Sequence, residues 1–516
     1  MKWPSPKSLL PGWKNALLAL LSSILLILAF PDFEYWFLAW FALVPLMWAV
    51  ERERESTAKS FVLGWLFGTL FFFGTCWWLA YAPIHYAAFP PLLAYSLVLI
   101  ACLGAGIFPG VFAAVLSFLL RRFGSIAILA APFVWVFTEF LRYWITGNNW
   151  NAIGYSQAFS TIMPVFARGG GVLLVSFVSI AMNSVALLFL LKRNWPASIL
   201  AIVVWLVVFP IGILMGIDNS GSSDPESVAN IIAVQPNVPM NGLDPQKWQS
   251  LRQRHIRLSE SALPKPKTEI RRPITVVFPE SPMNFQYEDD PETKAFIDGF
   301  ANMNSVSVLF NSAEPDRSNG KFFNSAVMVS PEGKEVAQYD KIYLLPFGEA
   351  VPVPFESIVP AFVGSFSYGK EYDLFPVGEA KAGVMICFES HFGQLSREYV
   401  RNGADVIIEM TNDGYLGPTP VLRQHLANAV FRAVETNRPV FRVTNVGITA
   451  YINKRGEVQD QATPYKEDTR VWSVEKSDGS QTFYVRYGDW FAWLCTLVTI
   501  VILGLAVRQR VSVART

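Results

Sequence analysis

One cysteine of this chain stands apart from the other three. Cys387 lies in a polar segment, whereas Cys76, Cys102 and Cys495 fall in long apolar runs. If the polar segment is exported, as the topology below indicates, an unpaired thiol is unexpected there unless it is buried or used as a nucleophile. The alternative is that Cys387 is a small buried hydrophobic residue at the end of a strand.

The sequence around Cys387 indicates a sharp turn. Residues 382–387 read as a buried strand and residues 390–402 as a helix, which places the cysteine at the elbow between them. Such a turn exposes the sulfur and leaves the following backbone amides free to bind an oxyanion. The thiol still needs a base and a positive charge, because free cysteine has a pKa of about 8.5. Three histidines are poorly placed to supply them, namely His255, His391 and His425.

A glutamate and a lysine fit the two missing roles better. Glu280 follows the strand of residues 274–278, and the ends of such strands deliver catalytic groups in α/β sandwiches. Lys341 follows a strand that leaves a hairpin, in the run Gln-Tyr-Asp-Lys-Ile-Tyr. Either residue alone would be a weak indication, since Glu and Lys lie most often on a solvated surface. The order Glu, Lys, Cys along the chain is what makes the set specific.

With these three motifs the polar segment resembles the nitrilase superfamily, which has an αββα sandwich and a Glu-Lys-Cys triad. The apolar runs narrow the resemblance to the apolipoprotein N-acyltransferase family of bacteria, which has seven N-terminal spans, a nitrilase-like domain and one closing span. The resemblance covers nearly the entire chain. Further matching runs lie at residues 138–142, 154–157, 345–349, 411–413, 435–439 and 444–445.

The resemblance implies acyl transfer in two steps. Glu280 acts as general base on Cys387, whose thiolate attacks an ester of a membrane phospholipid, and Lys341 with the Phe388 backbone N–H stabilises the oxyanion. The α-amine of the N-terminal diacylglyceryl-cysteine of an apolipoprotein then takes the acyl chain from the thioester. The expected partners are therefore this phospholipid donor, this acceptor and membrane lipid. No cofactor or metal is expected.

Several further residues are candidates for supporting roles. Glu349 and Glu389 are expected to orient Lys341 or Glu280 or to bind the incoming amine, and the alternative for both is a structural ion pair. The resemblance also places Phe388, Tyr343, Asn412 and Tyr415 near the site. The chain departs from the family pattern at two of these, with Phe388 in place of Tyr and Tyr415-Leu416 in place of Trp-Phe. These departures leave substrate preference open.

Glu139 and Arg142 lie one helical turn apart, near the outer end of a predicted span. Charged groups inside a membrane are costly and usually have a partner or a function. An ion pair that fixes helix packing and a site for a lipid head group are both consistent with this spacing.

The polar segment of residues 229–476 mixes strands and helices. Residues 420–437 read as a second helix, and hairpins are predicted through residues 331–333 and 454–456. The fold class is thus an α-helical membrane bundle plus an α/β, nitrilase-like αββα sandwich. The buried strands are expected at residues 230–234, 274–278, 306–310, 382–387 and 405–409.

Composition indicates that much of the chain faces lipid. Hydrophobic residues make up 52% of its 516 residues and charged residues only 16%, where about one quarter is usual for a soluble domain. The net charge of +1 gives no global basic field, so nucleic acid is not expected as a partner. Eight apolar runs are long enough to span a bilayer, at residues 14–30, 34–50, 60–81, 91–120, 126–145, 169–192, 197–216 and 489–507.

The positions of Lys and Arg predict how these spans are oriented. Cytoplasmic loops collect basic residues, and here short loops with several Lys or Arg alternate along the chain with short loops that hold almost none. Both termini are therefore expected in the cytoplasm of a bacterium, with the polar segment on the periplasmic or outer face of its inner membrane. The predicted domains are seven helices in residues 1–216, an exported catalytic domain in residues 217–488, and a closing helix with its tail in residues 489–516.

Residues 351–366 are unusually apolar for a loop between the Lys341 and Cys387 motifs. Three prolines, at positions 352, 354 and 360, forbid a regular helix over most of it. The loop either folds over the domain core or reaches into the outer leaflet or the acyl-chain path. In the second case the contacts come from Phe355, Phe362 and Phe366.

Two other functions compete with acyl transfer. A membrane-tethered amidase or nitrilase would use the same triad but let water resolve the thioester, and the sequence does not exclude water. A transporter or receptor with an exported binding domain would leave Glu280, Lys341 and Cys387 without a common role. Its helices would also be expected to carry a series of buried charges, which the first seven spans lack.

Overall fold

The computed structural model divides the chain into two compact units. It describes residues 10–191, 199, 226–241, 243–265, 272–280, 283, 285–351 and 366–513. The first unit comprises Met1–Asn219, Thr419–Ala427 and Tyr487–Thr516, and the second comprises Ser220–Pro418 and Asn428–Arg486.

The first unit is helical. Four of its described stretches are long and apolar enough to cross a membrane, at Thr57–Tyr86, Pro91–Thr146, Met163–Leu190 and Trp490–Arg508, and Trp13–Ala29 is a shorter apolar helix. The predicted span at residues 197–216 lies outside the described residues. The α-helices of this unit are α2 (Trp13–Ala29), α3 (Val44–Arg52), α4 (Thr57–Cys76), α5 (Tyr81–Tyr86), α6 (Pro91–Phe123), α7 (Ala131–Thr146), α8 (Ala167–Leu190) and α15 (Trp490–Val513).

Glycine lets α4 and α6 pack closely against each other. A Cβ atom added at Gly64 would lie 2.2 Å from the Pro109 carbonyl oxygen, and one at Gly106 would lie 2.6 Å from the Thr69 hydroxyl oxygen. Helix α6 is 33 residues long and is not interrupted at Pro109, which lies inside it. At 1.5 Å per residue it is about 50 Å long, which exceeds the hydrocarbon thickness of about 30 Å. A helix of this length must tilt or extend beyond the hydrocarbon.

The predicted single span at residues 34–50 is not one helix in the structure. A 3-10 helix at Trp36–Trp40 is followed by the short helix α3, which has a proline in its first turn. Proline has no backbone N–H and is favoured where a helix begins, so Pro45 starts a new helix here. The nine residues of α3 are too few to cross a bilayer alone.

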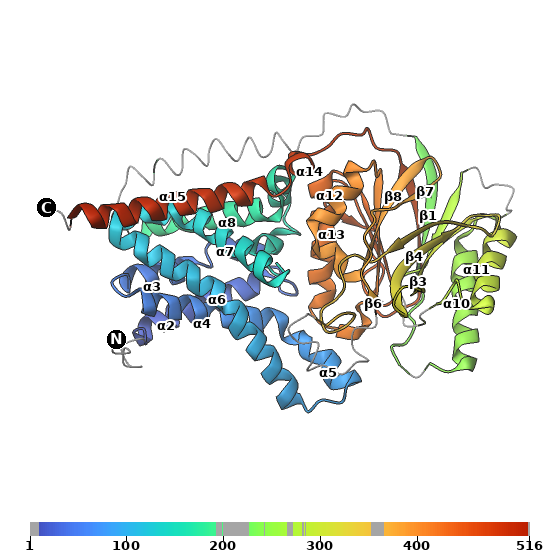
Figure 1. Cartoon of the computed structure of the whole chain (residues 1–516), viewed down its shortest axis with the longest axis horizontal. Helices are drawn as coiled ribbons and strands as arrows, with labels where there is room; N and C mark the ends of the chain where they lie inside the picture. Colours follow the sequence, from blue (N-terminus) through green and yellow to red (C-terminus); the bar gives the residue numbers. More distant parts are fainter. Residues whose placement is uncertain are drawn as a thin grey trace. The chain divides into compact units, whose positions relative to one another are not determined.

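The second unit contains two β-sheets whose outer faces are covered by helices (Figure 1). One sheet has the order β13-β1-β2-β3-β4-β5, with β6 paired to β4, and the other has the order β12-β11-β10-β9-β8-β7. Helices α10 (Pro245–Ala262) and α11 (Pro291–Asn304) cover the first sheet, while α12 (Gly393–Arg401) and α13 (Val421–Thr436) cover the second. This is the predicted α/β sandwich.

The strands of the first sheet are β1 (Ser227–Gln235), β2 (Ile274–Val277), β3 (Ser307–Asp316), β4 (Lys321–Val329), β5 (Glu335–Asp340), β6 (Phe366–Ser367) and β13 (Asp468–Glu475). Those of the second are β7 (Leu374–Val377), β8 (Ala380–Ile386), β9 (Val406–Thr411), β10 (Val440–Thr444), β11 (Ala450–Ile452) and β12 (Val458–Gln459). All five predicted strands are present, and both predicted hairpins form, between β4 and β5 and between β11 and β12.

The centre of each sheet is parallel. Strands β1, β2 and β3 run in one direction, and so do β8, β9 and β10. Their burial on both faces explains the largely apolar strands, such as Ile274–Val277, in which every residue is buried. The residues that follow β2, β8 and β9 therefore gather at the carboxyl ends of the strands, which is where α/β proteins place their sites.

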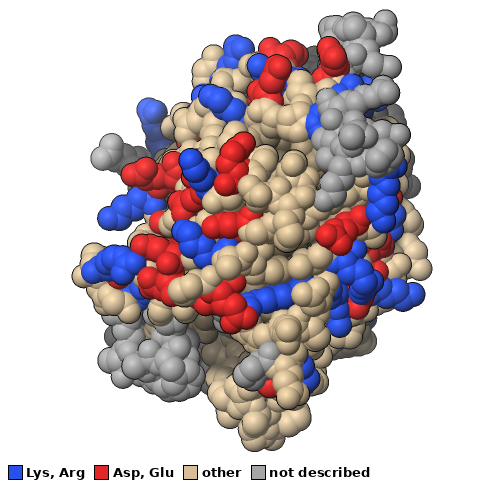
Figure 2. Space-filling model, turned by 90° about the vertical axis from the view of Figure 1, so that its right-hand side faces the viewer, with Lys and Arg blue, Asp and Glu red and all other residues tan. Residues whose placement is uncertain are grey.

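The face of the molecule that carries α10 and α11 is shown in Figure 2. Positive and negative side chains are interspersed over it without a large region of one sign. Many of them pair, as Arg317 does with Glu288 at 2.7 Å and with Asp289 at 3.1 Å. Such a mixed surface is typical of a face that contacts water.

His255 lies on α10 inside the core of the first sheet. Its Nδ1 atom is 2.7 Å from the Leu251 carbonyl oxygen, and its ring is edge-on to Phe278. Its Nε2 atom is buried and has no hydrogen-bond partner in the part of the chain that the structure describes. Burial lowers the pKa of His255 from 6.5 to about 4, so the folded unit holds this histidine neutral.

We therefore expect the α/β unit to lose stability as the pH falls from 6.5 towards 4. In this window the unfolded chain binds a proton that the folded chain does not, and the loss reaches about 3 kcal/mol. This loss of stability is measured by urea unfolding of the full-length protein in detergent, monitored through hydrogen exchange of the β2 amides. The difference between pH 7 and pH 4 should shrink in His255→Leu and persist in His85→Leu, whose histidine is exposed. An unchanged difference in His255→Leu would rule out this histidine as its source.

Candidate active site

Cys387 lies at the elbow that the sequence predicts. It follows β8 directly and begins a 3-10 helix, Cys387–His391, and not the α-helix that was expected from residue 390. Helix α12 starts only at Gly393. The backbone of Cys387 has φ of +51°, a left-handed conformation that costs a residue with a side chain roughly 1–2 kcal/mol. The surrounding strands hold this turn in place, because β8 pairs with β7 and β9 on its two sides.

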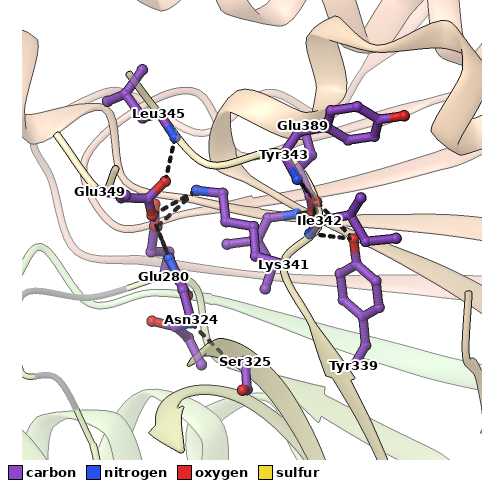
Figure 3. A network of polar contacts seen from close by, with 12 residues as sticks. Glu280, Asn324, Ser325, Tyr339, Lys341, Ile342, Tyr343, Leu345, Glu349 and Glu389 are labelled. Atoms are coloured by element: carbon purple, nitrogen blue, oxygen red, sulfur yellow. Dashed lines mark hydrogen bonds and ion pairs between the residues drawn. The ribbon is translucent and has the colours of Figure 1, made fainter. Parts of the chain in front are cut away.

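Lys341 and Glu280 come together from the ends of β5 and β2. The Lys341 side chain is 1% exposed, and its Nζ atom lies 3.8 Å from Glu280 Oε1. A second carboxylate is closer, because Nζ lies 2.8 Å from Glu349 Oε1 (Figure 3). The ammonium group is therefore buried between two carboxylates. Glu349 is fixed in turn by the Leu345 backbone N–H, which donates to its Oε2 atom at 2.7 Å.

Asn324 is a member of this cluster that the sequence does not reveal. It lies on β4, and its amide nitrogen donates to Glu280 Oε1 at 3.1 Å and to Glu349 Oε1 at 2.6 Å. Its oxygen accepts from Asn311 Nδ2 at 2.7 Å. The one available sign was a polar residue inside a strand that is otherwise largely apolar, and that sign is common in ordinary strands.

Glu389 connects the lysine loop to the nucleophile strand. It is fully buried, and its Oε1 atom accepts from the Tyr339 hydroxyl at 2.7 Å and from the backbone N–H of Ile342 and Tyr343 at 2.7 and 3.0 Å. Its Oε2 atom accepts from the Ile386 N–H at 2.9 Å. One carboxylate thus fixes the residues beside Lys341 and the residue before Cys387 (Figure 3).

The charges of the cluster favour a protonated thiol at rest. Burial and the Glu280 carboxylate raise the pKa of Cys387 well above its ordinary value, although Lys341 lowers it. Burial also raises the pKa of Glu280. Lys341 lowers this pKa, and the Glu349 carboxylate raises it further. The thiol hydrogen-bonds to the Glu280 carboxylate. A thiol and a carboxylate in contact form a nucleophile with its base, and the proton moves as the sulfur attacks.

The surroundings of Lys341 and Glu389 shift the pKa values of both groups upwards. Burial would lower the pKa of Lys341, but the Glu349 and Glu280 carboxylates raise it above its ordinary value. The lysine is therefore a permanent cation. Burial raises the pKa of Glu389 to about 7, although Lys341 and its hydrogen bonds oppose this.

The other predicted residues of the α/β unit lie in three kinds of surroundings. The Tyr343 ring stacks on Phe392 with centroids 4.2 Å apart, and the Phe388 ring lies beside His391 and Phe392, so these two pack locally. Tyr415 is exposed. Asn412 holds its own turn, since its Oδ1 atom accepts from the Gly414 N–H at 3.2 Å.

Phe366 of the apolar loop is half-buried in β6, where it pairs with Phe322 of β4. Phe355 and Phe362 lie outside the described residues.

Glu139 and Arg142 belong to the helical unit and do not form a direct ion pair there. Glu139 Oε1 accepts from the Ile153 N–H at 2.8 Å, while Arg142 donates to the Trp150 carbonyl at 2.9 Å and to Asn149 Oδ1 at 3.0 Å. Both charges therefore hold the loop that follows α7. The ion pair that was one of the two expectations is replaced by these loop contacts.

Among the described residues, no three His, Cys, Asp or Glu side chains are arranged to hold a metal ion. The cluster around Cys387 instead offers a thiol, a base and a buried cation, which together suit covalent catalysis at a carbonyl carbon.

Family models match both parts of the chain. Residues 22–185 match the apolipoprotein N-acyltransferase N-terminal domain, and residues 248–482 match the carbon-nitrogen hydrolase family. An apolipoprotein N-acyltransferase of Geobacter metallireducens is 31% identical over 96% of both chains. Proteins of the same name from Thermotoga maritima and Pasteurella multocida are 29% and 28% identical, again over at least 95% of each chain.

Solved structures of the nitrilase superfamily resemble about half of the chain. A branch 10 member from Saccharomyces cerevisiae is 19% identical and covers 50% of this chain and 93% of its own, with a TM-score of 0.38. An amidase from Nesterenkonia is 16% identical, with coverage of 52% and 96% and a TM-score of 0.38.

Asn324→Leu should move the acid side of the pH profile of turnover to higher pH. The Asn324 amide stabilises the Glu280 carboxylate and so lowers its pKa, and leucine removes this hydrogen bond while keeping a similar volume. Since Glu280 must be ionised to accept a proton, turnover should fall at a higher pH than in the wild type. We expect a loss of roughly ten-fold at neutral pH, the effect of one hydrogen bond to a charged group.

Asn311→Leu is the matched control, because the Asn311 amide donates to Asn324 Oδ1 and to the Ser325 carbonyl oxygen and so acts one residue away from the carboxylates. An acid side in Asn324→Leu at the same pH as in the wild type would contradict this role of the amide.

Proposed function

The chain belongs to the apolipoprotein N-acyltransferase family, and from this premise we propose which residues and substrates carry out its acyl transfer. The acyl donor is a membrane phospholipid. The acceptor is the α-amine of the N-terminal diacylglyceryl-cysteine of a bacterial lipoprotein. The chain itself is an acyltransferase of the carbon-nitrogen hydrolase family, as its matches over nearly the full length of named acyltransferases require.

The first half-reaction loads the acyl chain onto Cys387. Glu280 takes the thiol proton while the sulfur attacks the ester carbonyl of the phospholipid, and the lysophospholipid leaves with that proton. The observation that carries this step is the hydrogen bond from the Cys387 thiol to the Glu280 carboxylate, beside the buried Lys341 ammonium. A thioester on Cys387 results.

Lys341 stabilises the tetrahedral intermediate. Negative charge develops on the carbonyl oxygen, and a fixed ammonium group in a buried site is effective there because no water has to reorganise. The backbone N–H of Phe388 is the second donor, since it follows the nucleophile directly. One such donor is typically worth about 3 kcal/mol.

The second half-reaction transfers the acyl chain to the lipoprotein. The acceptor amine attacks the thioester carbonyl, Glu280 takes the proton of the amine, and the Cys387 thiolate leaves and is reprotonated. Lys341 again stabilises the oxyanion. The product carries an amide-linked third acyl chain.

Glu349 and Glu389 are positioning residues in this proposal. The 2.8 Å contact of Glu349 with Lys341 Nζ supports a role in aiming the ammonium group. The hydrogen bonds of Glu389 to both sides of the site support a role in keeping the lysine loop at a fixed distance from Cys387. Asn412 and Tyr415 are proposed to border the substrate path.

The membrane arrangement is also proposed. Eight spans, with both termini in the cytoplasm, would leave residues 217–488 on the periplasmic or outer face of the bacterial inner membrane. Residues 1–216 would provide seven spans and residues 489–516 the last. The four long apolar stretches of the helical unit support an integral membrane protein. Both lipid substrates stay in the bilayer, so the catalytic domain needs this anchor to reach them.

The closest competing activity is hydrolysis of the thioester by water. Nitrilase relatives share the triad, and its geometry alone permits either acceptor. The match of residues 22–185 to the N-terminal domain of apolipoprotein N-acyltransferases favours the amine, because amidases of the superfamily need no such helices to reach soluble substrates. Acyl transfer is therefore the preferred interpretation.

Incubation with phospholipid should add one acyl chain to the wild-type protein, and hydroxylamine should remove it. Cys387→Ala should never acquire the chain, whereas Cys495→Ala, which changes a buried cysteine of the closing helix, should load normally. Glu280→Gln and Lys341→Met should fold but fail to load, because each lacks a group needed in the transition state. Intact-mass measurement reads all of these. Acylation of Cys387→Ala would contradict the assignment of Cys387 as nucleophile. Full loading of Glu280→Gln or of Lys341→Met would remove that residue from the mechanism.

Replacement of the loop phenylalanines should weaken the use of phospholipid selectively. If Phe362 and Phe366 contact lipid or the acyl chain, their change to Ser should raise KM for phospholipid several-fold and leave loading from a soluble short-chain ester near wild type. Met303→Ser is the matched control, since Met303 is an exposed apolar residue of α11. Equal losses with both donors would show that the loop supports the catalytic core instead.

A further inference from the structure

The register of the second sheet places Thr411 beside Cys387. Strands β8 and β9 are parallel neighbours, and Ile386 pairs with Met410. The next residues along the chain are Cys387, which follows β8 directly, and Thr411 of β9. Thr411 is the last residue of β9 and is fully buried.

The backbone of Thr411 is held from the other side. Its carbonyl oxygen accepts from the Asn445 N–H at 3.0 Å, and the residue pairs with Thr444 of β10. Its position is therefore set by the sheet and does not depend on its hydroxyl group. A substitution that changes only the hydroxyl should leave the strand in place.

The hydroxyl itself has no hydrogen-bond partner among the described residues. Its Oγ1 atom is buried without such a hydrogen bond. An unpaired buried hydroxyl costs free energy. Cys387 is its neighbour in the sheet register, and the hydroxyl lowers the pKa of the Cys387 thiol.

Charged groups from several elements face the sulfur. Glu280 and Glu349 oppose ionisation of the thiol, while Lys341 favours it. Arg442 of β10 also interacts with Cys387, although its guanidinium is taken up by Glu409 and Asp413. The two carboxylates next to the thiol thus outnumber the one ammonium group. A neutral donor that reaches the sulfur reduces this imbalance without adding a charge.

We propose that Thr411 is a further catalytic residue, whose hydroxyl donates a hydrogen bond to the Cys387 sulfur when the sulfur carries negative charge. The inference rests on the proposed role of Cys387 as nucleophile. Thr411 keeps its own proton throughout. The S–H bond breaks towards the Glu280 carboxylate, the sulfur electron pair forms the bond to the carbonyl carbon, and the hydroxyl stabilises the sulfur during this transfer.

The same hydrogen bond acts again when the thioester is resolved. The C–S bond breaks, its electron pair returns to the sulfur, and negative charge reappears where the Thr411 hydroxyl lies. Thr411 therefore assists both half-reactions at the sulfur, whereas Lys341 assists them at the oxygen. The two groups act on different atoms of one transition state.

The test compares Thr411→Val, which keeps the branched shape and loses the hydroxyl, with Thr411→Ser, which keeps the hydroxyl. Full-length protein in detergent is treated with iodoacetamide over a pH series, and the adduct on Cys387 is measured by mass spectrometry. Cys387→Ala, treated in the same way, gives the blank. Thr411→Val should titrate about one pH unit higher than the wild type and react about ten-fold more slowly below its pKa. Acyl loading from phospholipid should slow by a similar factor. Thr411→Ser should stay within about two-fold of the wild type.

Two results would overturn the proposal. One is a Thr411→Val profile that coincides with that of the wild type. The other is an equal loss in both variants with no change in the titration, which would indicate a packing role. Failure of the nucleophile assignment is recognised separately, because Cys387→Ala would then still acquire the acyl chain.

Discussion

The site depends on one buried cation. The Lys341 ammonium is 1% exposed, and a charge removed from water is tolerated only with partners that replace its hydration. Glu349 supplies the contact at 2.8 Å and Glu280 supplies a weaker one at 3.8 Å. This asymmetry has a chemical consequence, because the carboxylate that neutralises the lysine is not the one that contacts the thiol. Glu280 is left free to exchange a proton.

The polar groups around this cation are fixed by backbone and amide donors. Asn324 bridges the two carboxylates, and Glu389 ties the lysine loop to the strand before Cys387. Asn324 lies within β4 of the first sheet, whereas Glu389 lies in the 3-10 helix that follows β8 of the second, so the site forms only when both sheets are in place. Preorganised dipoles of this kind lower the energy of a developing charge, because they do not have to turn when it appears.

Sequence reasoning found the parts of the site that have a local signature. Glu280 and Cys387 each follow a strand that can be recognised from its apolar run, and Lys341 follows a strand that leaves a predicted hairpin. The elbow at Cys387 follows from a strand and a helix in direct succession. Asn324 and Thr411 have no such signature, because each belongs to a strand and gains its role from a group that another strand brings beside it. Register across a sheet is a tertiary property that a single sequence does not contain. The break after Trp40 was missed for a different reason, since an apolar run reads as one span even where Pro45 starts a new helix.

The central claim is that the thioester on Cys387 is consumed by an amine and not by water. The most direct measurement starts from protein loaded with a labelled acyl chain and freed of phospholipid, to which a diacylated lipopeptide is added. Label should leave Cys387 and appear on the α-amine of the lipopeptide in equal amount, much faster than it is lost without the lipopeptide. Release of the label as free fatty acid at the same rate with and without the lipopeptide would contradict the account.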